Sequence, residues 1–106
     1  MNKHTLLTSI INTACKITNQ GLSAGRSGNI SMRHGAGMFI TPTGIASSQL
    51  TPSDIVFVDD QGRWSDAGLK PSSEWHFHHA VYQKRPDAQC IIHTHSPMAT
   101  SLACAL

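Results

Sequence analysis

The run Ile55-Val56-Phe57-Val58 constrains the fold more than any other feature of the sequence, because four successive positions are apolar and most are β-branched. Such a run favours a strand over a turn. A strand that is apolar on both faces is typical of one with other elements packed on each side. We therefore expect this strand to be buried on two sides.

The remaining predicted elements are two helices and further strands. Apolar residues at three- and four-residue spacing predict an amphipathic helix from about Lys3 to Gln20. A second helix, opened by Lys70-Pro71-Ser72-Ser73, is expected to run to about Lys84. Strands are predicted at 29–33, 38–41 and 88–94, with a hairpin turn at 34–37, and a helix-like stretch is predicted to begin at 97–106. Together these elements indicate a mixed α/β fold.

Composition excludes several classes of protein. Eight basic and six acidic residues are scattered along the chain, so no basic stripe indicates a nucleic-acid partner. No apolar run approaches the roughly 18 to 20 residues that a membrane span needs. The three cysteines form no Cys-x-x-Cys pair, which argues against a disulfide framework and a thiolate zinc site. We expect a cytoplasmic protein without a membrane or nucleic-acid partner.

Two histidines are the sharpest candidates for metal binding. His93 and His95 stand at positions i and i+2 of a predicted strand, so both side chains point to one face, roughly 6.5 to 7 Å apart along the backbone. Two imidazoles so placed can converge on one metal ion. A half-exposed pair on a sheet edge is the second interpretation of the same pattern.

Ser72, Ser73 and Glu74 are predicted to form the first turn of the second helix. Unsatisfied N–H groups and the helix dipole favour a bound anion there, and the hydroxyls add donors for a phosphate. Simple capping of the helix by the serines, with Glu74 complementing the dipole, explains the same residues.

Two loops rich in small residues, 25–29 and 41–44, carry N–H and hydroxyl donors next to predicted strands. Such loops can hold a phosphate without a P-loop, although each also fits an ordinary turn. For His76, His78 and His79 we expect structural or solvent-facing roles, because no carboxylate or cysteine accompanies them at ligand spacing.

In this order and spacing, five segments resemble the class II aldolase and adducin head-domain family, most closely its fuculose-phosphate aldolase branch. They lie between about residues 25 and 105 and are Ser27–Arg33, Ile40–Gly44, Leu69–Glu74, Tyr82–Asp87 and Ile92–Pro97. The resemblance implies a three-layer α/β fold with a largely antiparallel central sheet flanked by helices. Residues 1–106 are then the N-terminal part of a single domain that is incomplete at the C-terminus.

The resemblance also implies roles for individual residues. His93, His95 and Glu74 are expected to hold one Zn²⁺ per subunit, with Glu74 as the catalytic acid/base. The residues expected to grip the substrate phosphate are Gly28, Asn29, Thr43, Gly44, Ser72 and Ser73. A third zinc histidine and a C-terminal tyrosine, which family members carry downstream, are absent here, and this argues against full activity by the chain alone.

The implied reaction is a zinc-dependent retro-aldol cleavage of a short ketose 1-phosphate, of the L-fuculose-1-phosphate type, to dihydroxyacetone phosphate and an aldehyde. A ribulose-phosphate 4-epimerase is a weaker candidate, because those relatives tend to carry aspartate at the position of Glu74. A sugar-acid-phosphate decarboxylase and a non-catalytic, adducin-head-like domain are two further candidates. The implied partners are a phosphorylated sugar and further copies of the chain, with a tetramer expected for the complete family fold.

Overall fold

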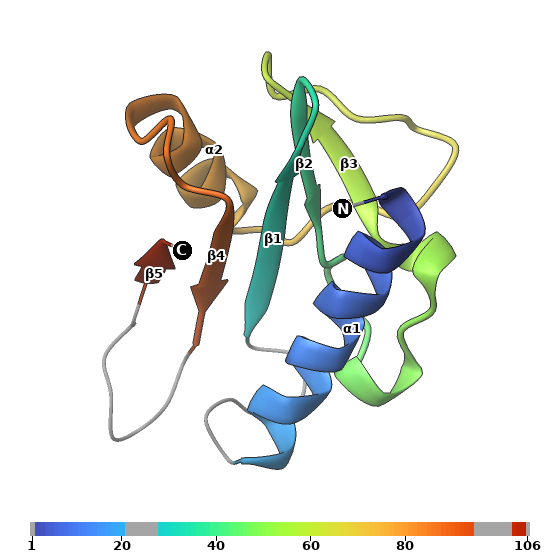
Figure 1. Cartoon of the computed structure of the whole chain (residues 1–106). Helices are drawn as coiled ribbons and strands as arrows, with labels where there is room; N and C mark the ends of the chain where they lie inside the picture. Colours follow the sequence, from blue (N-terminus) through green and yellow to red (C-terminus); the bar gives the residue numbers. More distant parts are fainter. Residues whose placement is uncertain (1, 21–27, 95–102, 106) are drawn as a thin grey trace.

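The computed structural model describes residues 2–20 and 28–94, together with the backbone of 103–105. In these residues five strands form one antiparallel sheet in the order β3-β2-β1-β4-β5 (Figure 1). The strands are β1 (Asn29–His34), β2 (Gly37–Ile40), β3 (Val56–Asp59), β4 (Cys90–His93) and β5 (Ala103–Ala105). The helices are α1 (Lys3–Asn19) and α2 (Trp75–Lys84), with short 3-10 helices η1 (Ser47–Gln49) and η2 (Pro52–Asp54).

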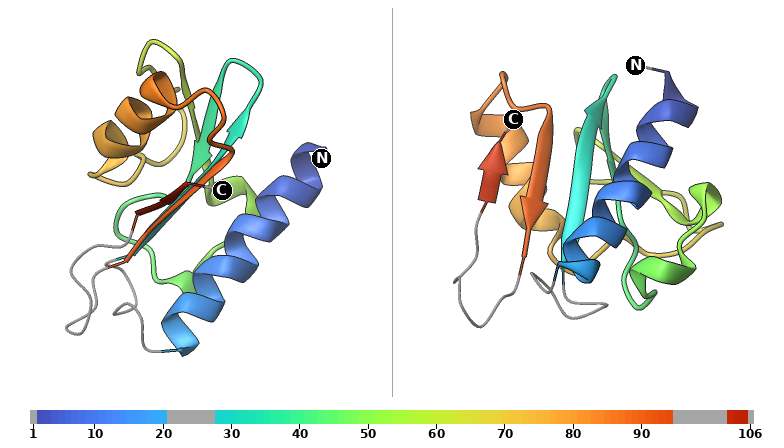
Figure 2. Two further views of the ribbon diagram at one scale, coloured as in Figure 1. Left: turned by 60° about the vertical axis from the view of Figure 1, so that its left-hand side comes forward. Right: turned by 60° about the horizontal axis from the view of Figure 1, so that its bottom comes forward.

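The two α-helices cover opposite faces of the sheet, so the fold has three layers (Figure 2). Helix α1 begins where Asn2 Oδ1 accepts a hydrogen bond from the N–H of Thr5, at 2.9 Å. Its apolar stripe packs against Ile30 and Phe39 of the sheet, and the buried residues of that stripe are Leu6, Leu7, Ile10, Ala14 and Ile17. The predicted first helix and the predicted fold class are confirmed.

The opposite face of the sheet packs against α2 and the segment that follows it. This second core consists of Met38, Ile40, Val56, Val58, Tyr82, Ala88 and Ile91. Met38 and Ile40 face this side while Phe39 between them faces α1, as the two-residue period of a strand requires. The same period directs Asn29 and Ser31 of β1 towards α2, which places polar side chains in an otherwise apolar layer.

The hairpin between β1 and β2 is confirmed. Gly35 adopts a positive φ of 54° in its turn. At Gly37, where the strands pair with β3, an added Cβ would lie 2.8 Å from the Cα of Asp59 and 2.6 Å from Cζ of Phe57. The glycine therefore permits a close approach of β2 and β3.

The prediction that strand Ile55–Val58 is buried on two sides is wrong. Strand β3 starts at Val56 and lies at the edge of the sheet. Val56 and Val58 are buried in the second core, whereas Phe57 on the other face keeps 36% of its surface exposed. Helix α1 packs on β1, and the ring of Phe57 contacts that of Phe39 at 5.1 Å between centroids.

The start predicted for the second helix is also wrong. Helix α2 begins at Trp75, so Ser72 and Ser73 precede it and Glu74 is its N-cap residue. The segment before it is held extended, because the Thr43 N–H donates to Lys70 O and the Ser72 N–H donates to Thr41 O. Pro71 also pairs with Pro42 in an antiparallel bridge, and backbone in this extended conformation does not have the dihedral angles of a helical turn.

The predicted helix-like stretch at the end of the chain is contradicted in part. Ala103–Ala105 forms β5, which pairs antiparallel with β4. Pairing with the exposed edge of β4 supplies the backbone hydrogen bonds that a helix would otherwise supply internally. The rest of that prediction, 97–102 and Leu106, lies outside the described residues.

Arg33 of β1 fixes the C-terminal end of α2. Its Nε donates to Ala88 O at 2.8 Å, and its Nη2 donates to Tyr82 O at 2.9 Å and Arg85 O at 3.1 Å. The guanidinium carbon also lies 4.7 Å from the centroid of the Tyr82 ring. One side chain of the sheet therefore satisfies three carbonyls at the end of the helix.

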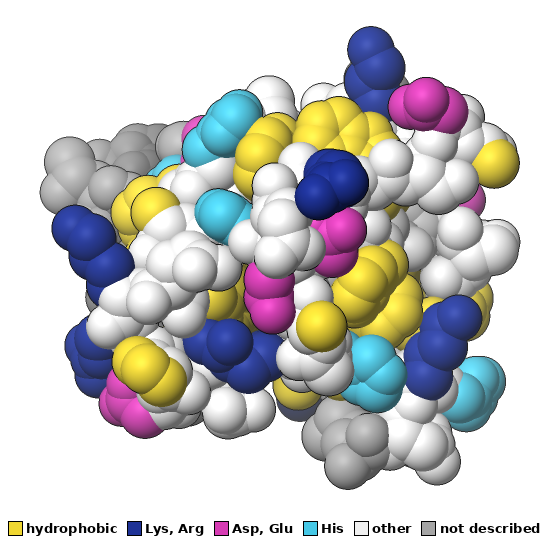
Figure 3. All heavy atoms as spheres, turned by 90° about the horizontal axis from the view of Figure 1, so that it is seen from above, with side chains coloured by type: hydrophobic (Ala, Val, Ile, Leu, Met, Phe, Trp, Pro, Cys, Tyr) yellow, Lys and Arg dark blue, Asp and Glu magenta, His cyan; other side chains and the backbone are white. Residues whose placement is uncertain are grey.

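No helix in the described ranges is long and apolar enough to cross a membrane. On the face shown in Figure 3, basic and acidic side chains are interspersed and form no patch of a single sign. That distribution agrees with the small net charge of +2.

Candidate active site

Asn29 and His93, two of the predicted site residues, lie at one end of the sheet, the lower end in Figure 1. There β1 begins and both β2 and β4 end, since Asn29 of β1 is the register partner of His93 in β4. Just after the end of β2, the Thr41 hydroxyl accepts a hydrogen bond from the Ile30 N–H of β1 at 3.2 Å. The antiparallel pairing thus brings segments that are far apart in the sequence to one place.

Glu74 and His93 meet at this end of the sheet. The Glu74 carboxylate contacts His93 Nδ1 through Oε2. The side chain of His93 is 11% exposed and that of Glu74 is 33% exposed, so the pair lies at the edge of the interior. Phe77, one helical turn after Glu74, covers the imidazole of His93 with its ring centroid 5.3 Å away.

The local backbone leaves the Glu74 carboxylate facing the sheet. Glu74 makes no side-chain capping bond to its own helix. The neighbouring Ser72 hydroxyl oxygen accepts the Glu74 N–H at 3.2 Å, and Ser72 O accepts the Trp75 N–H at 3.0 Å. With these donors satisfied by Ser72, the carboxylate can interact with β1 and β4.

Asn29 is buried, with 4% of its surface exposed, and its amide lies between two groups of the α2 layer. Its Nδ2 donates to Glu74 Oε2 at 3.3 Å, and its Oδ1 contacts Nε2 of His78. His78 has no exposed surface, and its Nδ1 lies 2.6 Å from the Ser31 hydroxyl. Burial, together with the positive charge that His93 can carry, lowers the pKa of His78 to about 4.

The sequence-based prediction for His78 missed this network. Of the two roles expected for it, structural or solvent-facing, the second does not apply to His78, which is fully buried, whereas His76 is exposed. Glu74, His78 and Tyr82 follow at four-residue spacing, and Asn29 and Ser31 at two-residue spacing. These two periods on facing elements are the signal that could have indicated the cluster.

The 41–44 loop, one of the two loops predicted to hold phosphate, is a neighbour of the segment before α2. Of the other, 25–29, the structure describes only Gly28 and Asn29. Besides the two backbone hydrogen bonds that tie 41–43 to 70–72, Pro42 and Pro71 form an isolated antiparallel bridge. Thr43, Gly44 and Ser73 are exposed, and Gly44 adopts a positive φ of 80°. Ser72 is 8% exposed, and Gly28 is partly exposed at the start of β1.

The donors at Glu74 and His93 are chemically suited to a divalent metal, because a carboxylate oxygen and an imidazole nitrogen are usual ligands of zinc. Within the described ranges, no group of three or more His, Cys, Asp and Glu side chains is arranged to hold a metal ion. The predicted third ligand, His95, lies outside those ranges. Glu74 and His93 therefore match two members of the predicted set of three zinc ligands.

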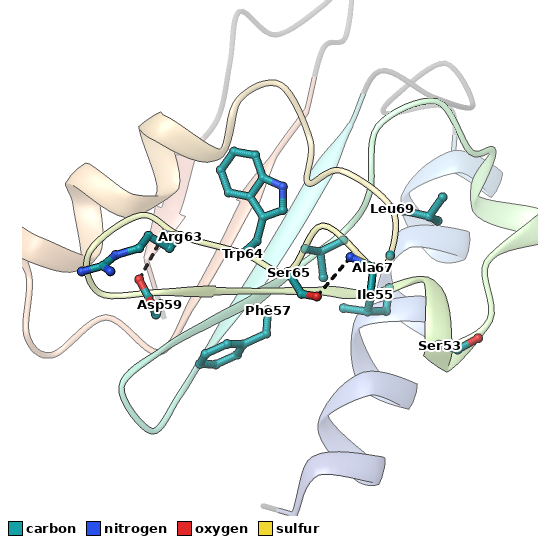
Figure 4. A pocket seen from close by; sticks show the side chains of 11 residues that line it. Ser53, Ile55, Phe57, Asp59, Arg63, Trp64, Ser65, Ala67 and Leu69 are labelled. Atoms are coloured by element: carbon teal, nitrogen blue, oxygen red, sulfur yellow. Dashed lines mark hydrogen bonds between the residues drawn. The ribbon is translucent and has the colours of Figure 1, made fainter.

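A groove of about 630 Å³ lies between β3 and the segment that follows it (Figure 4). Phe57, Trp64 and Leu69 supply its apolar lining, and Asp59 and Arg63 lie at its polar end. None of the predicted site residues lines this groove.

Comparison with known proteins gives the family of the chain. The sequence profile of the Class II Aldolase and Adducin N-terminal domain matches residues 8–106. The chain belongs to this family. The predicted resemblance to the class II aldolase and adducin head-domain family is therefore confirmed.

Relatives of known activity include aldolases of two kinds. A 5-methylthioribulose-1-phosphate/5-deoxyribulose-1-phosphate aldolase of Rhodospirillum rubrum is 47% identical over 95 residues, which are 90% of this chain and 42% of the relative. The L-fuculose phosphate aldolase of Escherichia coli K12 is 46% identical over 103 residues, which are 97% of this chain and 47% of the relative. The chain thus spans less than half the length of these relatives.

Solved structures share the fold. An L-fuculose 1-phosphate aldolase superimposes with a TM-score of 0.82 at 35% identity, covering 88% of this chain and 45% of the aldolase. The YgbL protein of Klebsiella pneumoniae superimposes with a TM-score of 0.84 at 32% identity, covering 92% of this chain and 47% of YgbL. The chain therefore has the fold of a little less than half of each of these proteins.

Proposed function

We propose that this class II aldolase family member takes part in the zinc-dependent cleavage of a short ketose 1-phosphate, of the L-fuculose-1-phosphate type, to dihydroxyacetone phosphate and an aldehyde. The observation that carries the proposal is the contact between Glu74 and His93, which joins a helix-cap carboxylate to a strand-end imidazole. Two relatives, which act on L-fuculose phosphate and on 5-deoxyribulose 1-phosphate, support the substrate class.

Glu74, His93 and His95 are the residues that we propose to hold the zinc ion. Glu74 and His93 already present their oxygen and nitrogen to one another, and His95 follows at the i+2 position. When bound, zinc supplies Lewis-acid polarisation of an oxygen of the substrate.

Glu74 is proposed as the acid/base that moves a proton during cleavage. Its side chain is one-third exposed, so a substrate can reach it, while Asn29 and His93 keep it oriented from the sheet side. A carboxylate that is fixed and yet accessible satisfies the geometric requirement for proton transfer.

The phosphate is proposed to lie over the paired segments 41–44 and 70–73. There it would contact Gly28, Asn29, Thr43, Gly44, Ser72 and Ser73. Exposed hydroxyl and backbone groups at Thr43, Gly44 and Ser73 support this placement. Asn29 Nδ2 carries two hydrogens, so one can serve Glu74 and the other a phosphate oxygen. Holding the phosphate away from the reacting carbons aligns the substrate with Glu74.

The assembly is part of the same proposal. Residues 1–106 form the N-terminal part of a single family domain, and the complete protein is proposed to be a cytoplasmic homotetramer. The chain's share of its relatives, 42% and 47%, is what a part of one such domain would cover.

The test is release of dihydroxyacetone phosphate, measured by enzymatic coupling, from L-fuculose 1-phosphate and from 5-deoxyribulose 1-phosphate. We expect release that EDTA abolishes and zinc restores, and that Glu74→Gln lowers by roughly a hundredfold or more. Asp66→Asn, at an exposed carboxylate, is the matched control and should leave the rate unchanged. Release that survives Glu74→Gln or EDTA would contradict the proposal.

Zinc stoichiometry gives a second readout that does not depend on turnover. We expect about one zinc per chain by calorimetric titration, lost in His93→Ala and kept in His4→Ala, a substitution at an exposed histidine of α1. Equal zinc binding by both variants would remove His93 from the site. If zinc binds and neither sugar phosphate is cleaved, an epimerase or decarboxylase assay follows.

A further inference from the structure

His78 lies between α2 and the sheet, and the proposed reaction leaves it without a role. Both of its ring nitrogens have partners: Nδ1 is 2.6 Å from the Ser31 hydroxyl, and Nε2 contacts Asn29 Oδ1. The Ser31 hydroxyl is also 2.8 Å from the Tyr82 hydroxyl. Tyr82, Ser31, His78, Asn29 and Glu74 thus form one chain of hydrogen bonds that ends at the proposed acid/base.

The direction of these hydrogen bonds is fixed from the Glu74 end. An ionised carboxylate only accepts hydrogen bonds, so the Asn29 group facing Glu74 must be the NH₂. Asn29 Oδ1 then faces His78, where it can only accept. His78 must therefore carry its proton on Nε2.

The other half of the chain of hydrogen bonds follows from the neutral state of His78. Since burial lowers its pKa to about 4, the ring is neutral at pH 7 and Nδ1 is an acceptor. The Ser31 hydroxyl then donates to Nδ1 and accepts from the Tyr82 hydroxyl. Burial raises the pKa of Tyr82, so the phenol keeps the proton that it donates.

We propose that His78, as the Nε2–H tautomer, is a positioning residue that orients the Asn29 amide so that its NH₂ group holds the Glu74 carboxylate in place. The link to catalysis rests on the proposed function of Glu74. His78 touches no substrate in this proposal and acts only through Asn29.

Loss of the His78 donor has a specific consequence. Asn29 Oδ1, on a side chain that is 4% exposed, would be left without its hydrogen bond. The amide relieves this by rotating towards another donor, and the NH₂ group then leaves Glu74. A histidine that only filled space would have no such effect on Asn29.

The first test is the tautomer in the metal-free wild-type chain. Long-range ¹H–¹⁵N NMR of the imidazoles, with His78 assigned by the signal lost in His78→Gln, should show a protonated Nε2 and an unprotonated Nδ1 at pH 7.5. An Nδ1–H tautomer would overturn the proposal, and this measurement needs no variant to be active.

The second test compares His78→Gln with His78→Asn. The glutamine amide can reach the position of Nε2 and donate to Asn29, whereas the shorter asparagine amide reaches only the position of Nδ1. We expect the side-chain NH₂ of Asn29 to exchange with solvent slowly in wild type and His78→Gln, and at least tenfold faster in His78→Asn. Equal exchange in both variants would overturn the proposal.

Activity separates this inference from the proposed function. We expect kcat to fall roughly tenfold to a hundredfold in His78→Asn and to be largely restored in His78→Gln, with exposed His76→Asn as control. Equal kcat in both His78 variants would overturn the positioning role and leave the function intact. If wild type cleaves no sugar phosphate while the tautomer and exchange results hold, the proposed function fails and the orientation by His78 stands.

Discussion

Asn29 Nδ2 lies 3.3 Å from Oε2 of Glu74, so a buried side chain of β1 donates a hydrogen bond to the carboxylate that precedes α2. The bond links two layers of the fold, the sheet and the helix that covers one of its faces. Its value to the fold can be measured apart from any catalysis.

Asn29→Asp should destabilise the protein by roughly 1 to 3 kcal/mol at pH 7.5. The substitution keeps the shape of the side chain, removes the donor, and places a second carboxylate beside Glu74. Urea unfolding gives the free energy. The double variant Asn29→Asp with Glu74→Gln should recover most of the loss, and if it recovers none, the two side chains are not coupled.

The free energy of unfolding should fall in mild acid because of His78. The pKa of this histidine is about 4 in the folded protein and 6.5 in an exposed histidine. Between these values the unfolded chain binds a proton that the folded chain excludes, so the stabilisation present above pH 6.5 is lost as the pH drops towards 4. At pH 4.5 the free energy of unfolding that is lost because of His78 is roughly 2 to 3 kcal/mol, since one pKa unit corresponds to about 1.4 kcal/mol.

Urea unfolding of wild type and His78→Gln at pH 7.5 and pH 4.5 isolates that contribution. Histidines that do not interact with His78 respond to acid equally in both proteins, so the difference between the two pH effects reports His78 together with its charge interactions with neighbouring groups. A glutamine variant that loses as much stability as wild type would refute this assignment.

Arg33→Lys should cost about 2 kcal/mol of stability. Lysine keeps the charge but cannot reach Tyr82 O, Arg85 O and Ala88 O at once, which the planar guanidinium does. The urea midpoint is the measurement. Arg85→Lys, which alters the solvent-exposed ion pair with Asp87, is the matched control and should shift the midpoint far less.

Gly37→Ala should destabilise the sheet by about 2 kcal/mol or more. The added methyl would meet Asp59 Cα and Phe57 Cζ of the paired strand, and the backbone there can yield only by breaking the β2–β3 register. Gly68→Ala is the control, because its Cβ meets nothing within 4 Å and its φ is not positive. A midpoint equal to that of Gly68→Ala would show that β3 adjusts freely.

Much of the fold is predictable from local patterns in the sequence. The spacing of Leu6, Ile10 and Ile17 predicts α1, and the glycine turn predicts the β1–β2 hairpin, because both depend on residues close in the chain. The exposure of Phe57 does not follow from its neighbours, since it depends on which strand lies at the edge of the sheet. The late start of α2 has a similar cause, because the distant Thr41 loop holds Ser72 extended.

The candidate site is predicted unevenly for the same reason. The sequence names Glu74, Asn29 and His93, and the structure brings their side chains together. The role of His78 depends on Asn29 and Ser31 facing α2 across the layer, which no single element reveals. Residue types predict the chemistry, whereas the partners of a buried polar group come from packing.

Because Asn29 and His93 are register partners, the candidate site is complete only in molecules in which β1 and β4 have paired. The stretch of chain between these two residues contains β2, β3 and α2, so its ends meet only after that long loop has closed. A ligand that engages Glu74 and His93 together must select molecules in which closure is complete, and it shifts the folding equilibrium towards them. The proposed zinc ion or sugar phosphate would then stabilise the pairing of β4 with β1, and its removal should weaken that pairing first.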